Sequence, residues 1–185
     1  MWRGRIINDP AMIKIAIDTN IRNLKQIDPV LNLLHQYHNE GLIEIVVAQS
    51  YIEENKDTDE AFDAAIKFEN IKEPFVIGFG HIGSAYISDG KPRASVKEIS
   101  SVLFPDFSLD ELNRNQKNDV MHIVSCIHKE IEYFVTRNKY DFIATKRNNS
   151  NRNDDGRHND KRIALKKHGI TVLTPEELVT LIKDN

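Results

Sequence analysis

Three carboxylic acids occupy positions from which a parallel α/β fold could bring them together. Asp18 follows the apolar run 12–17, Glu53 falls in the first turn of an expected helix, and Asp119 precedes the apolar positions of another. Phosphodiester hydrolysis requires an activated water and neutralisation of negative charge, and carboxylate-bound Mg²⁺ or Mn²⁺ supplies both. Such a cluster would repel itself without a cation. We therefore expect Mg²⁺ or Mn²⁺ bound by Asp18, Glu53 and Asp119.

Each acid also has a simpler structural explanation. Asp18 could end a strand as a turn residue, and Asp119 could be an N-terminal helix acid stabilised by the helix dipole. Ser50 and Glu53 have the capping-box pattern, which explains Glu53 without any function, and Glu54 is the one-residue alternative. The order of the acids along the chain, rather than any single one, carries the prediction.

The elements that must position these acids follow from periodicity and from turn residues. The expected strands cover residues 12–17, 42–48, 133–136 and 170–173. Helices are expected at 29–39 before Gly41, from Ser50 to 68, from Asp119 to 131, and from Pro175 onward. This alternation predicts an α/β fold with a central parallel sheet between two helical layers, whose sites lie at the carboxyl ends of strands.

Two segments fit this scheme poorly. The Gly- and Pro-rich stretch 70–117 is interpreted as an insertion with a hairpin or small helices, and 145–161 as a mobile basic loop within a single domain of residues 1–185. Residues 78–83 spell the dinucleotide-binding pattern G-x-G-x-x-G, but Gly90 and Pro92 follow too soon for a phosphate-binding helix. We expect a Gly-rich turn there. Residues 1–11 match nothing in the expected core, so Met12 is an alternative start.

Four motifs in order resemble the PIN (PilT N-terminus) domain family. They are the strand ending in Asp18-Thr19-Asn20, the Ser50-Tyr51-Ile52-Glu53 helix start, the Asn118-Asp119-Val120-Met121-His122-Ile123 segment, and Tyr133-Phe134-Val135-Thr136-Arg137-Asn138-Lys139-Tyr140-Asp141-Phe142. The final strand and helix, from Gly169 to Leu178, are also similar to those of the family. The resemblance covers most of the chain outside the segments 70–117 and 145–161.

The resemblance implies a metal-dependent ribonuclease with Asp141 as a fourth catalytic and metal-binding acid. Many members carry Asp where this chain has Asn138, so either Asp141 completes the site or the fourth acid is missing. Asn20, Thr136, Asn138 and His122 are then expected to position substrate or water. The alternative is a weakly active or inactive PIN-like domain that binds RNA or protein. Stand-alone members imply a small antitoxin partner, and a homodimer is a further expectation.

Charge is distributed unevenly along the chain. The net charge is −3, yet residues 144–168 hold eight Lys or Arg against three Asp, which is +5 and leaves −8 elsewhere. Six basic residues are expected to contact RNA phosphates: Lys146, Arg147, Arg152, Arg157, Lys161 and Arg162. The alternative is a solvated loop without a partner.

Composition sets the remaining expectations. With 40% hydrophobic and 29% charged residues, the chain is typical of a globular protein that folds around a core. Its apolar runs are too short to span a membrane, its start lacks a secretory pattern, and its single cysteine, Cys126, lies among apolar residues. A reducing, cytoplasmic setting is expected. His35 and His38 have the spacing of a helical metal pair but lack carboxylate support.

Overall fold

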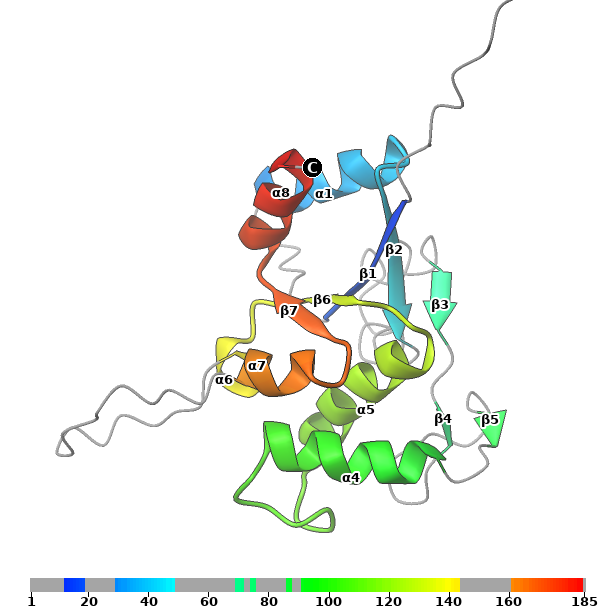
Figure 1. The fold of residues 1–185 in the computed structure, drawn as a ribbon, viewed down its shortest axis with the longest axis vertical. Helices are drawn as coiled ribbons and strands as arrows, with labels where there is room; N and C mark the ends of the chain where they lie inside the picture. The colour runs from blue at the N-terminus through cyan, green and yellow to red at the C-terminus, as the bar shows by residue number, and fades with distance from the viewer. Residues whose placement is uncertain are drawn as a thin grey trace, which may run out of the picture.

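A five-stranded parallel sheet organises the structure. The computed structural model describes residues 12–18, 29–48, 69–71, 74–75, 86–87, 91–143 and 161–184. The strand order is β3-β2-β1-β6-β7, with every neighbouring pair parallel (Figure 1). The strands are β1 (Ile13–Ile17), β2 (Ile43–Ala48), β3 (Glu69–Ile71), β6 (Tyr133–Val135) and β7 (Thr171–Leu173). The predicted α/β class with a parallel sheet is confirmed.

Strand β1 lies at the centre of the sheet, and its residues are apolar apart from Lys14. Its sequence is IKIAI, and the three residues Ile15, Ala16 and Ile17 are buried. A parallel strand covered on both faces requires this near-continuous β-branched run. Ile15 pairs with Ile45 of β2 on one side, and Ile17 pairs with Val135 of β6 on the other. The carboxyl ends of β1 and β6 therefore meet at one edge of the sheet.

Two of the described helices cover one face of the sheet. Helices α1 (Pro29–Asn39) and α8 (Pro175–Asp184) lie side by side (Figure 1), and their Leu34 and Leu178 join a buried cluster with Ile15 and other strand residues. The predicted helix 29–39 is confirmed. Gly41, with φ +75°, ends it: the Gly41 N–H donates to His38 O at 3.0 Å, and the next N–H donates to Tyr37 O at 2.9 Å.

Of the helices that the structure describes, four lie on the opposite side of the sheet. They are α4 (Lys91–Leu103), α5 (Arg114–His128), α6 (Lys139–Phe142) and α7 (Lys161–Lys166). Their apolar side chains and the other face of the strands form the larger buried cluster, which includes Phe134 and Phe142 with ring centroids 5.0 Å apart. Helices on both faces are compatible with the expected three-layer α/β/α arrangement.

Much of the segment 70–117 belongs to this core. Helix α4 packs on α5 through buried residues such as Val96 and Ile99, and it begins with Pro92 in its first turn, where proline is tolerated. Strands β4 (Pro74–Phe75) and β5 (Tyr86–Ile87) form a separate parallel pair. The interpretation of 70–117 as an insertion stays a prediction, and the Gly-rich turn at 78–83 lies outside the described residues.

The start of α5 differs from the expectation. The helix begins at Arg114, not at Asp119, because Asn113 and Gln116 form a capping box: the Asn113 side chain accepts from Gln116 N at 3.0 Å, and the Gln116 side chain accepts from Asn113 N at 3.0 Å. Asp119 therefore lies in the second turn, and its role as an N-terminal helix acid is wrong. Within the described part of the chain, no helix is long and apolar enough to cross a membrane.

Candidate metal centre

Asp18 lies at the carboxyl end of the central strand. Its backbone N–H donates to Val135 O at 3.0 Å, which continues the pairing of β1 with β6 one residue beyond the strand. Its side chain is 0% exposed. A carboxylate removed from water in this way requires partners that offset the loss of hydration. The sequence predicted Asp18 at this edge of the sheet, and the structure places it there.

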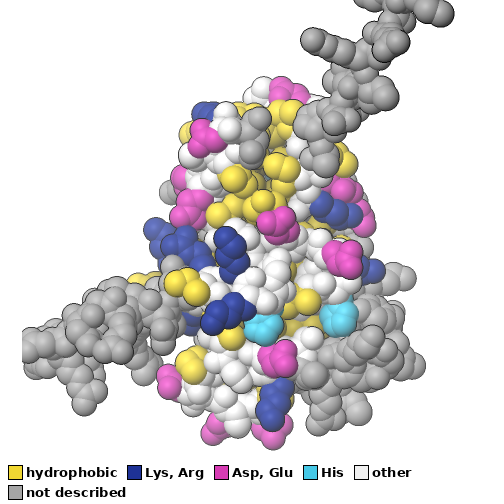
Figure 2. All heavy atoms as spheres, viewed as in Figure 1, with side chains coloured by type: hydrophobic (Ala, Val, Ile, Leu, Met, Phe, Trp, Pro, Cys, Tyr) yellow, Lys and Arg dark blue, Asp and Glu magenta, His cyan; other side chains and the backbone are white. Residues whose placement is uncertain are grey.

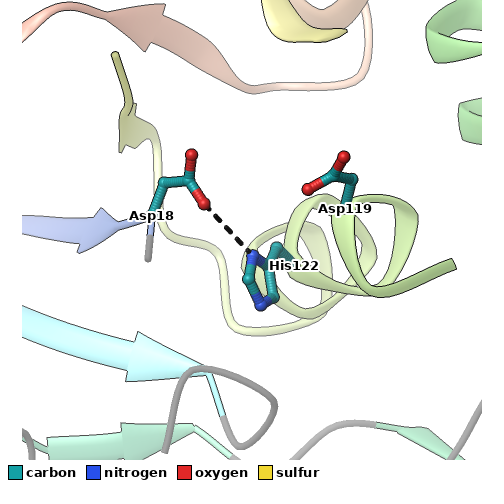
Figure 3. Close-up of side chains that lie close together, drawn as sticks. All are labelled: Asp18, Asp119 and His122. Atoms are coloured by element: carbon teal, nitrogen blue, oxygen red, sulfur yellow. Dashed lines mark ion pairs between the residues drawn. The ribbon is translucent and has the colours of Figure 1, made fainter. Parts of the chain in front are cut away.

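Helix α5 supplies the two other members of a compact group. Asp119 and His122 lie one turn apart on this helix, and both face Asp18 (Figure 3). One ligand atom from each of Asp18, Asp119 and His122 lies within 4.8 Å of the others. Asp119 is half-buried, whereas Asp18 and His122 are buried. The structure thus brings together Asp18, Asp119 and His122, and two of these were predicted as metal ligands.

His122 belongs to this group, but its ring nitrogens make no hydrogen bond to the described residues. Its Nδ1 lies 3.8 Å from Asp18 Oδ1, which is too far for a hydrogen bond, and its side chain is 2% exposed. Among the described residues, neither Nδ1 nor Nε2 has a hydrogen-bond partner. Buried polar atoms are nearly always satisfied by protein, water or an ion. Two carboxylates and an unpartnered imidazole therefore form a donor set that fits a divalent cation.

Thr136 fixes the orientation of the Asp18 carboxylate. Its hydroxyl Oγ1 donates to Asp18 Oδ2 at 2.6 Å and accepts from the backbone N–H of Asn138 at 2.9 Å. Thr136 is 0% exposed, and its own N–H donates to Leu173 O at 2.9 Å, so the residue is held by β7 as well. The predicted positioning hydroxyl therefore contacts the carboxylate that would bind the metal.

Asn138 and Asp141 bind each other. Asn138 is the N-cap of α6: its side-chain oxygen accepts from Asp141 N at 3.2 Å, and its Nδ2 donates to Asp141 Oδ2 at 2.6 Å. Asp141 is not a member of the group formed by Asp18, Asp119 and His122. The amide at position 138 thus engages the carboxylate that the sequence offered as the fourth ligand.

Lys161 is turned toward the interior, which differs from the predicted phosphate contact. Its Nζ donates to Leu103 O at 2.7 Å, to Asp141 O at 3.0 Å and to Tyr140 O at 3.1 Å. Burial lowers the pKa of Lys161, while the carboxylates of Asp141 and Asp119 oppose that shift. Since all three ammonium protons are used, none is left for a phosphate. Lys161 instead links α7 to the backbone of Leu103 at the end of α4 and to the backbone of Tyr140 and Asp141 in α6.

The other predicted site residues divide into two sets. Arg162 is described, and its Nη1 forms an ion pair with Glu177 Oε1 at 3.0 Å. His38 Nδ1 lies 3.2 Å from Ile43 O and 3.3 Å from Ile45 N, which accounts for His38 without a metal. Outside the described residues lie Asn20, Glu53, Glu54, Lys146, Arg147, Arg152 and Arg157.

Sequence reasoning treated His122 as a substrate contact and did not group it with the metal ligands. The signal that could have revealed it was present, because a His three residues after an acid on a helix projects from the same face.

A comparison of the chain with protein-family models found no match, and a comparison with curated proteins found none either.

Proposed function

We propose that the protein is a metal-dependent endoribonuclease of the PIN type that hydrolyses RNA phosphodiester bonds. The observation that carries the proposal is the convergence of Asp18 and Asp119 at the carboxyl edge of a parallel sheet, beside a buried imidazole without a hydrogen-bond partner. Such an edge is where open α/β folds place their sites. The motif order that resembles the PIN family adds the reaction and the substrate class.

Asp18 and Asp119 differ in burial, and this difference sets the role that we assign to each. Asp18, held by Thr136, provides a fixed ligand at the floor of the site, and half-buried Asp119 provides a ligand on its open side. In the proposal Glu53 adds a further carboxylate, and the Asn138–Asp141 pair borders the site. A bound Mg²⁺ or Mn²⁺ would supply an activated water and neutralise charge on the phosphate.

Exposed cations near the site suit a polyanionic substrate. Arg137 and Lys139 flank Asn138 and are exposed, and Arg137 also forms an ion pair with Glu176 at 3.3 Å. Figure 2 shows Lys and Arg side chains gathered over the region of α6 and α7. Contacts of this kind add affinity for phosphates without base specificity. They support RNA as the substrate in the proposal, alongside the basic residues of 144–160.

The test is cleavage of a labelled single-stranded RNA by purified protein with Mn²⁺ or Mg²⁺. We expect cleavage that a chelator stops and that Asp18→Asn and Asp119→Asn each reduce by at least about a hundredfold, as expected when a catalytic electrostatic group is lost. Asp106→Asn, a change of an exposed acid, is the matched control and should keep full activity. Cleavage that persists with the chelator and in both site variants would refute the proposal.

The Asn138–Asp141 hydrogen bond favours one other candidate function. Because Asn138 Nδ2 engages Asp141 Oδ2 at 2.6 Å, the chain could bind RNA or protein at this edge without cutting. Asn138→Asp removes the amide that donates to Asp141 and places a second carboxylate beside it. The Asp141 carboxylate should then be available to bind metal. A binding module predicts RNA affinity with no cleavage in the native protein, and cleavage that appears only in Asn138→Asp.

A further inference from the structure

We infer that His122 is a direct metal ligand, which makes the centre a mixed nitrogen and oxygen site that selects a transition-metal ion over Mg²⁺. The inference rests on the metal site of the proposed function, but it does not depend on RNA being cleaved. An all-carboxylate site was expected from the sequence, with His122 beside the substrate. The structure places the His122 ring with the carboxylates instead (Figure 3).

The spacing between His122 and Asp18 suits two ligands of one ion. Nitrogen and oxygen ligands lie about 2.1 Å from a metal such as zinc, so two ligands of the same ion lie at most about 4.2 Å apart. His122 Nδ1 and Asp18 Oδ1 are 3.8 Å apart, which is too long for a hydrogen bond but within this limit. All three ligand atoms lie within 4.8 Å of one another, so a small side-chain movement brings all three within reach of one ion.

Among the described residues, the surroundings of His122 offer its imidazole no hydrogen-bond partner. The residue is 2% exposed, and its ring packs near the ring of Phe134 with centroids 6.4 Å apart. Its neighbours Met121 and Ile123 are also buried. A polar ring held in apolar surroundings costs stability unless its nitrogens are bonded. Coordination by Nδ1 supplies a bond that the described protein groups do not.

The identity of the metal follows from the ligand types. Mg²⁺ requires hard oxygen ligands and keeps several waters, whereas imidazole suits zinc, iron, copper and nickel. Mn²⁺ suits carboxylates, as Mg²⁺ does, but as a first-row transition metal it also accepts nitrogen ligands. Adding the imidazole of His122 to the carboxylates therefore raises the affinity for Mn²⁺ and Zn²⁺ relative to Mg²⁺. His122 becomes the residue that determines metal specificity.

The direct test is spectroscopy of the native protein. Metal is removed with a chelator, Mn²⁺ is added back, and electron spin-echo measurements detect whether a nitrogen nucleus couples to the ion. We expect nitrogen coupling from one imidazole. Oxygen-only coordination, or no specific Mn²⁺ binding, would overturn the inference. This measurement needs no variant, so it decides the question even if changing His122 impairs folding.

A titration with paired variants tests the specificity. In native protein we expect Mn²⁺ to bind at least about tenfold more tightly than Mg²⁺. His122→Gln should weaken Mn²⁺ by at least about tenfold, since even groups behind the ligands contribute that much. It should change Mg²⁺ affinity far less. His35→Gln, an exposed histidine on α1, is the control for adventitious surface binding and should change neither affinity. Equal losses for Mn²⁺ and Mg²⁺ in His122→Gln would contradict the inference.

RNA cleavage measured on the same preparations separates this inference from the proposed function. Nitrogen coupling without cleavage would refute the nuclease proposal and leave the role of His122 intact. Cleavage by a centre with oxygen ligands alone would support the nuclease proposal and overturn the inference about His122.

Discussion

The Thr136 hydroxyl offers the sharpest test of how the candidate centre is held. Thr136→Val keeps the branched shape but removes the hydroxyl that donates to Asp18 Oδ2 at 2.6 Å and accepts from Asn138 N at 2.9 Å. A hydrogen bond to a charged group contributes about 1.5–3 kcal/mol, and one between neutral groups about 0.5–1.5 kcal/mol. The first bond is buried and the second is part-buried, so we expect their combined loss to cost about 3 kcal/mol.

The assay is urea denaturation of metal-free protein, so that metal binding does not offset the loss. For a chain of this length about 3 kcal/mol corresponds to a melting temperature lower by roughly 6–12 °C. Thr136→Ser is the matched control: it keeps the hydroxyl and loses one buried methyl group, which costs about 1 kcal/mol. If the valine variant is as stable as the serine variant, the hydroxyl does not hold Asp18, and the reasoning about the site floor fails.

Three further predictions concern features around the site. Lys161→Met leaves three backbone carbonyls without a donor. After allowing for relief of the buried charge, we expect the free energy of unfolding, measured by urea denaturation, to fall by about 2 kcal/mol. An unchanged midpoint would contradict the role of Lys161. Burial raises the pKa of Cys126 to about 12, so the folded state keeps a proton that the unfolded thiol releases above its usual pKa of 9.0. Stability should therefore fall by about 1 kcal/mol from pH 9 to 10 through this thiol, and Cys126→Ala should have a correspondingly flatter profile; identical slopes would refute this. Gly41→Ala forces a side chain into φ +75° and should cost about 1 kcal/mol, whereas Gly41→Asn should cost less, as measured by thermal melting; equal costs would argue against backbone strain.

The sequence was most informative where local chemistry decides the structure. The run IKIAI could be identified as a buried parallel strand from its β-branched residues, and the helix Pro29–Asn39 from its period and from Gly41. The start of α8 was also readable: Thr174 Oγ1 accepts from Glu177 N at 3.2 Å, and Glu177 Oε2 accepts from Thr174 N at 2.8 Å. Caps and periodicity involve residues that are close in sequence, so a single chain carries the signal.

The sequence was least informative where a side chain's partner is distant. Lys161 looked like part of a basic loop, but its partners are the carbonyls of Leu103, Tyr140 and Asp141, which no sequence pattern marks. The helix Lys91–Leu103 was obscured by Gly90 and Pro92, although proline is acceptable in a first turn. The helical spacing of Asp119 and His122 was readable from the sequence, whereas the 3.8 Å approach of His122 to Asp18 joins residues far apart in the sequence.

The hydrogen bond from Thr136 to Asp18 has a consequence for the order of events during synthesis. Its two residues are 118 positions apart, and the strand that carries Thr136 pairs beside the strand that carries Asp18. Contacts of such long range close late, because most of the intervening chain must first be made and ordered. A ribosome-bound fragment ending before residue 136 therefore lacks the floor of the centre. We expect such a nascent chain to hold no metal ion at this position.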